Sequence, residues 1–198
     1  FIKYIYMKYK IKYKSIGGAD FVANRIQFNN DSLRDAVQLW YDDEEQARRN
    51  YGDINEWDVS QVTDMSELFN DKVNFNSNIG NWITSRVTNM GFMFMDAISF
   101  NQDISNWDTS RVENMVFMFH NARLFNQDIS NWNTSNVIDM EGMFSIAISF
   151  RNANQPLITR GTAWDTSRVT DMSNMFFEAT VFNQDISNWD VSNVLNMS

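Results

Sequence analysis

Tryptophan recurs along this sequence at an almost constant interval, and that periodicity constrains the fold more than any other feature. Successive members of the series are 25, 25, 25, 32 and 25 residues apart, at Trp57, Trp82, Trp107, Trp132, Trp164 and Trp189. Valine, methionine and two phenylalanine series keep the same phase. Self-similarity with a period of about 20–50 residues is typical of solenoids and related repeat arrays. The chain is therefore predicted to be a tandem repeat of a 25-residue unit.

Each unit is predicted to contain one short helix and one short strand. Apolar residues recur at i, i+3, i+4 and i+7 within residues 112–122, which is the spacing of one helix face. An Asp or Asn stands where a helix N-cap would be, just before each in-phase methionine. The short strand is expected near residues 103–108, where Ile104 and Trp107 are the apolar anchors.

No single unit can bury its own apolar face, so stacking of units has to supply the core. The predicted fold class is an α/β repeat solenoid, a right-handed coil of five full turns and part of a sixth. The in-phase residues are interpreted as its core, namely Trp57, Trp82, Trp107, Trp132, Trp164, Trp189, Met90, Met115, Phe94 and Phe119.

The sequence divides into three parts. Residues 1–30 form a basic tail that is expected to be poorly ordered or non-native, with a basic arm for an anionic surface as the alternative. Residues 31–52 are predicted to be one amphipathic helix that caps the stack and ends at Gly52. Residues 53–198 carry the repeats, and because the sequence ends within a repeat we expect a fragment of a longer protein.

Charge and composition exclude several classes of function. The formal net charge is −9, and residues 52–198 carry 18 acidic against 7 basic residues, a net of −11. This acidity argues against nucleic acid and against anionic membrane surfaces as partners. No apolar run is long enough to span a bilayer, and the absence of cysteine excludes disulfides and thiolate chemistry. We expect a monomer without nucleic-acid or membrane partners.

Nothing in the sequence predicts a catalytic residue, a metal ligand or a cofactor. His120 occupies a variable position and is expected to face solvent, with no second His or Cys to complete a nucleophile–base pair. Aspartates recur in two registers, and we interpret them as turn residues in preference to calcium ligands. The first register contains Asp103, Asp128 and Asp185, and the second contains Asp58, Asp108, Asp165 and Asp190. The serine series Ser60, Ser85, Ser110, Ser135, Ser167 and Ser192 is expected to satisfy backbone groups between coils.

One unit carries a seven-residue insertion near residues 151–161. The chain reads FRNANQPLITRGTAW where other units have FNQDISNW, and Pro156 and Gly161 indicate a loop. Insertions in repeats usually loop out on one face, and loops often carry function. The candidate binding residues are Arg151, Asn152, Asn154 and Arg160, and the alternative is a functionally neutral surface insertion.

The repeat resembles a known family. FNQDISNWDTSRVENMVFMFHNA and the related segments at 75–97, 125–147 and 182–198 are similar to the BspA-like surface-protein repeat of mycoplasma lipoproteins. The similarity covers about residues 52–198, and that repeat is itself similar to leucine-rich repeats. The resemblance implies an extracellular or cell-surface location and adhesion or protein binding, without established catalytic residues.

The sequence thus predicts a non-catalytic, surface-displayed module that binds a protein or a glycan. Two alternatives remain open: a purely structural spacer, and a carbohydrate-active enzyme that uses paired carboxylates.

Overall fold

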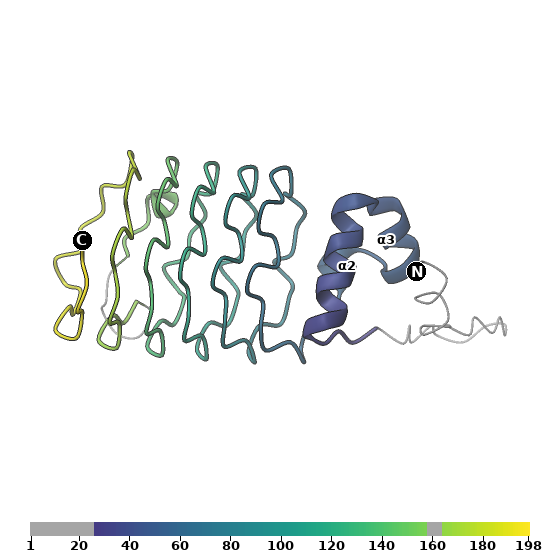
Figure 1. The fold of residues 1–198 in the computed structure, drawn as a ribbon, viewed down its shortest axis with the longest axis horizontal. Coiled ribbons are helices and arrows are strands. Elements are labelled where there is room, and N and C mark those ends of the chain that lie inside the picture. The colour runs from purple at the N-terminus through teal and green to yellow at the C-terminus, as the bar shows by residue number, and fades with distance from the viewer. Residues whose placement is uncertain (1–25, 158–163) are drawn as a thin grey trace.

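Successive 25-residue units form coils that stack along one axis in the computed structural model, which describes residues 26–157 and 164–198 (Figure 1). Isolated parallel bridges join the same position of consecutive units, from Asp64–Asn89 through Asn89–Asn114, Asn114–Asp139 and Asp139–Asp171 to Asp171–Asn196. One unit therefore makes one coil, and equivalent side chains lie in register along the stack.

The segment predicted to be a helix, residues 112–122, adopts a different backbone conformation. The N–H groups of Met115, Phe117 and Phe119 donate to carbonyls of the next coil at 3.0, 2.8 and 2.9 Å. The backbone turns at Phe117 and Asn121, whose φ values are 49° and 54°. An α-helix would direct these N–H groups to carbonyls four residues back in the same coil. Here they link neighbouring coils, while the face predicted to be apolar is still the buried one, at Met115, Met118, Phe119 and Ala122.

The strand expected near residues 103–108 is also absent from the described coils. Between coils, strand-like pairing occurs instead at the position of Asn114 and is limited to single bridges, while one further bridge joins Asp58 of the first coil to Gln27. Glu113 donates to the carbonyl of Thr88 at 2.8 Å, and Ile138 in turn donates to the carbonyl of Glu113 at 2.8 Å. The sheet-like pairing between coils thus lies next to the methionine position, at Asn114 and not at residues 103–108.

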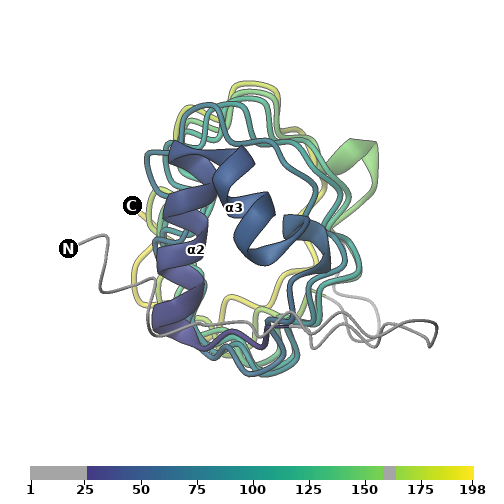
Figure 2. The same ribbon diagram turned by 90° about the vertical axis from the view of Figure 1, so that its right-hand side faces the viewer.

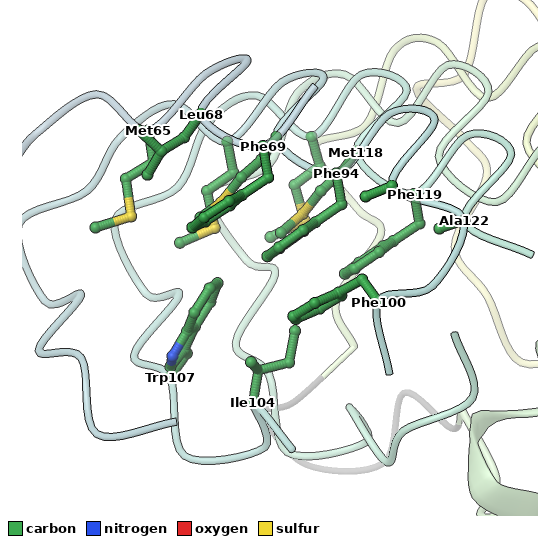
Figure 3. Packing of buried hydrophobic residues seen from close by; sticks show 14 of the residues in the cluster. Met65, Leu68, Phe69, Phe94, Phe100, Ile104, Trp107, Met118, Phe119 and Ala122 are labelled. Carbon is green, nitrogen blue, oxygen red and sulfur yellow. The ribbon is translucent and has the colours of Figure 1, made fainter. Parts of the chain in front are cut away.

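Stacked aromatic rings fill the interior of the coils (Figure 3). The rings of Trp107 and Trp132 are almost parallel, 4° apart in orientation, with centroids 6.4 Å apart. Phe94 and Phe119 stack in the same way at 5.5 Å. From Trp82 onward, each in-phase indole N–H also donates to a carbonyl of the preceding coil, as Trp132 does to Ile104 at 3.1 Å. Every coil is therefore tied to its neighbour by both ring contacts and hydrogen bonds.

Two helices cover the N-terminal end of the stack, where the sequence predicts one (Figure 2). They are α2 (Asn30–Asp42) and α3 (Glu44–Tyr51), followed by the 3-10 turn η1 (Ile54–Glu56). The chain breaks at Asp43, whose extended φ of −150° is not helical and whose carboxylate caps α3 by accepting from the Gln46 N–H at 2.9 Å. The buried residues of these helices are Leu33, Ala36, Val37, Trp40 and Ala47.

The cap seals the stack through an aromatic cluster. The ring of Trp40 meets Trp57 of the first coil edge-on, with centroids 5.7 Å apart. Phe28 falls within the predicted tail, yet it is 2% exposed and its N–H donates to the carbonyl of Asp58 at 2.8 Å. Residues 26–29 thus belong to the fold, whereas residues 1–25 of the predicted tail lie outside the described residues.

Candidate functional site

The insertion is divided into two parts around one buried residue. Phe150 and Leu157 are seven residues apart where Phe125 and Ile129 are four apart, so three extra residues precede Leu157. The other four extra residues follow Leu157. Leu157 is fully buried, and its carbonyl accepts the indole N–H of Trp189 at 3.0 Å. It therefore fills the place that isoleucine holds in the other coils.

The three extra residues before Leu157 project from the stack as a 3-10 turn, η2 (Asn152–Asn154) (Figure 2). Asn152, Ala153 and Asn154 have φ values of 53°, 49° and 63°, in the left-handed region. Asparagine tolerates this region, but alanine pays about 1–2 kcal/mol to enter it. Such strain persists only where the surroundings hold it in place. We call residues 151–157 the insertion lobe.

Asn152 is the anchor of the insertion lobe. It is fully buried, its side-chain oxygen accepts the Ile129 N–H at 2.8 Å, and its amide donates to the Gln155 carbonyl at 2.8 Å. A side chain with both polar atoms satisfied inside the protein is not available to a partner. Asn152, a candidate contact residue in the sequence, is thus placed in a supporting position.

The exposed side chains of the insertion lobe are those of Arg151, Asn154, Gln155 and Pro156. The Arg151 backbone is fixed at both ends, because its N–H donates to Asn126 at 2.8 Å and its carbonyl accepts from Gln184 at 3.1 Å. Its guanidinium forms no ion pair with the described residues. Arg160, the fourth candidate, lies outside the described residues.

The recurring aspartates are turn residues, as the sequence predicts. The Ser105 N–H donates to Asp103 at 2.9 Å and the Ser110 N–H donates to Asp108 at 3.0 Å. The serine hydroxyl and backbone N–H hold the pKa of each of these two carboxyls below its usual range. Within the described residues, no group of three or more His, Cys, Asp or Glu side chains is placed to hold a metal ion.

These turns predict a specific loss of stability in acid. A carboxyl whose folded pKa is lowered stabilises the fold above its unfolded pKa of about 3.9, and this contribution disappears as the pH falls further. Asn133 makes the same turn, because it accepts the Ser135 N–H at 3.0 Å. The variant Asp103→Asn/Asp108→Asn should therefore lose less stability than the unmodified chain between pH 7 and pH 3. Urea midpoints at both pH values measure this, and equal losses would contradict it.

Threonine, and not the predicted serine, bridges neighbouring coils. Thr84 and Thr109 donate from their hydroxyls to the carbonyls of Asp108 and Asn133, both at 3.0 Å. Thr134 and Thr166 repeat the contact at 2.9 Å. These four threonines are at most 1% exposed. The serines of the predicted series, except Ser85, instead donate their N–H to the Asp or Asn two residues before them in the same turn. The signal in the sequence is an in-phase threonine directly before the serine.

The side chains of His120 and Glu141 are two further polar groups of the middle coils. His120 is half-buried against the edge of Phe117, at 5.4 Å between ring centroids, where the sequence predicts exposure to solvent. Burial raises the pKa of Glu141, with contributions from the charges of Asp171 and Asp139. Asp171 itself is held by Ser173 in the same turn geometry as the other aspartates.

A family model matches most of the chain. It is described as "Mycoplasma protein of unknown function, DUF285" and it matches residues 37–156 and 149–198. The chain belongs to the DUF285 family. No curated protein matches the chain, and no solved structure matches it.

The DUF285 match runs from within α2 to the end of the chain in two spans. Its two spans overlap at residues 149–156, which contain most of the insertion lobe. No helix in residues 26–157 or 164–198 is long and apolar enough to cross a membrane.

Proposed function

We propose that this DUF285 chain is a non-catalytic, surface-displayed binding module that recognises a protein or a glycan through the insertion lobe. Its coils are taken as a right-handed solenoid of the leucine-rich-repeat kind, acting as a monomeric scaffold. The observation that carries the proposal is the lobe itself. It interrupts an otherwise regular stack, is anchored at Asn152 and Leu157, and directs polar side chains outward.

The anchoring supports recognition because it fixes the shape of the lobe before any partner arrives. A loop that is already ordered loses little conformational freedom on binding, so more of the contact energy appears as affinity. The exposed groups are a guanidinium, two amides and a proline ring, from Arg151, Asn154, Gln155 and Pro156. Guanidinium and amide groups can hydrogen-bond either a polypeptide or sugar hydroxyls.

The test compares two variants of the chain on an array of extracellular proteins and glycans. The lobe variant Arg151→Ala/Asn154→Gly/Gln155→Ala removes exposed side chains, avoids an alanine at the positive φ of residue 154, and leaves Asn152 and Leu157 in place. The matched control, Arg111→Ala, removes an exposed arginine from a regular coil. The unmodified chain is expected to bind at least one ligand saturably, and the lobe variant should lose about tenfold or more in affinity, or about 1.4 kcal/mol.

Circular dichroism spectra should show all three proteins equally folded. Saturable binding that Arg111→Ala retains and the lobe variant loses supports the proposal. Equal binding by the lobe variant would show that another face of the protein recognises the ligand. No binding by any of the three proteins would leave the structural spacer as the better account.

A further inference from the structure

A small hollow opens at the edge of the first coil, on the side of the molecule next to the cap. It has a volume of about 220 Å³ and is lined by residues 55–60 together with Asn81 and Ile83. Ile83 is 59% exposed, more than most large apolar residues of the described chain. The exposure of this large aliphatic side chain beside the hollow has a local physical cause.

The cause is that two residue series depart from their pattern at the same junction. Val59 occupies the place of the bridging threonines, so it has no hydroxyl to donate to the next coil. Ile83 occupies a place that is Asp or Asn in every other coil. The Ile83 carbonyl, whose equivalents accept from threonine, receives no hydrogen bond from residues 26–157 or 164–198.

The hollow is also rich in hydrogen-bond acceptors. Glu56, Asp58 and Ile83 are among its lining residues, and the Asp58 carboxylate already accepts the Ser60 N–H and hydroxyl at 3.1 and 2.6 Å. The side-chain oxygen of Asn55 accepts the Asn81 N–H at 3.1 Å, and the Asn81 amide reaches Glu56 at 3.4 Å. Two negative charges and a backbone carbonyl around an aliphatic wall favour a cationic group with several N–H donors on an apolar stem.

The volume of the hollow further limits which chemical group can bind there. Pockets for small molecules usually enclose about 300–1,000 Å³, so this hollow suits a single side chain better than a cofactor. Trp57 lies in the wall but is only 5% exposed, so it offers no ring face on which a sugar could stack. We propose that the hollow receives an arginine side chain of a partner protein, with its stem on Ile83 and its guanidinium at Glu56 and the Ile83 carbonyl.

This inference does not depend on the insertion lobe. The hollow lies in the first two coils, whereas the lobe begins at Arg151. The two proposals can therefore fail separately. The lobe variant should bind an arginine probe as well as the unmodified chain does, whatever the array experiment shows.

The experiment titrates the folded chain with N-acetyl-arginine amide and follows the side-chain NMR signals of Asn55, Asn81 and Ile83. The matched probe is N-acetyl-citrulline amide, which has the same shape without the charge, and N-acetyl-lysine amide tests the preference for a planar group. We expect saturable shifts with a Kd of about 1–10 mM for the arginine probe and at least about tenfold weaker binding of citrulline.

Three variants locate the binding. Glu56→Gln keeps the shape of the hollow and should weaken arginine binding by about fivefold or more, as expected for loss of a charged acceptor. Val59→Thr supplies the missing hydroxyl to the Ile83 carbonyl and should also weaken it. The control Asp108→Asn removes a carboxylate outside the hollow and should change the affinity by less than about twofold.

Several results would overturn the inference. These are absence of saturable shifts at the hollow, equal binding of arginine and citrulline, and equal losses in Glu56→Gln and Asp108→Asn. Methyl glucoside is included as a probe, and preferential binding of that sugar would assign the hollow to a glycan instead.

Discussion

Replacing Trp132 by alanine is expected to lower the free energy of unfolding by about 3–5 kcal/mol, the usual cost of removing a large buried aromatic residue. Trp132 is fully buried in the middle of the stack. Its ring stacks on Trp107 at 6.4 Å and also contacts Phe119 at 6.1 Å. Its N–H satisfies the buried carbonyl of Ile104, which would lose that donor.

The matched control is Trp189→Ala in the last coil. Trp189 is 9% exposed and stacks on Trp164, which belongs to the preceding coil, at 5.9 Å. The same substitution there should cost less, because Trp189 is less completely buried than Trp132. Urea unfolding followed by circular dichroism measures both losses. Equal losses at the two positions would contradict the expected dependence on burial.

Replacing Gly142 by alanine is expected to cost about 1–3 kcal/mol, because it combines backbone strain with a steric clash. Gly142 has a φ of 56°, and an added Cβ would lie 2.1 Å from Cε1 of Phe117. The Phe117 ring, which stacks on Phe92 at 5.6 Å, would have to leave its position over Gly142. The loss should appear as a lower urea midpoint.

Two controls separate strain from clash. Gly52 also has a positive φ, 78°, but nothing lies within 4 Å of an added Cβ. Gly52→Ala should therefore cost only the strain. In a double-mutant cycle, Gly142→Ala should cost less when Phe117 is already alanine. A cost of Gly142→Ala that is unchanged by Phe117→Ala would show that the ring contact does not matter.

The burial of whole residue series could be predicted from the sequence, but the local backbone could not. Met115, Met118, Phe119 and Ala122 have helical spacing and are all buried, yet the chain between them turns instead of forming a helix. Spacing reports which side chains face inward. It does not report whether an N–H group bonds to its own coil or to the next, and that choice decides between helix and turn.

The candidate site, too, could be predicted from the sequence only in part. The extra residues between Trp132 and Trp164 locate the insertion lobe, because any departure from a strict period must loop out. The opposite roles of Asn152 and Asn154 follow from which side chain reaches the Ile129 N–H, a contact with the preceding coil that no local pattern encodes. The hollow does have a sequence signature, because Val59 and Ile83 both differ from the other members of their residue series.

The in-register hydrogen bonds also bear on how such a protein can change length during evolution. Each coil contacts mainly its two neighbours, and equivalent groups meet at successive junctions, as in the bridges from Asp64 to Asn196. Duplicating or deleting one whole 25-residue unit would recreate the same contacts between coils, so no new kind of contact would be needed. Each duplication between the cap and the insertion lobe would move the lobe outward by about 4.8 Å, the usual spacing of paired strands. Reach could thus be adjusted in fixed steps by recombination between repeats, while the residues that face a partner stay unchanged.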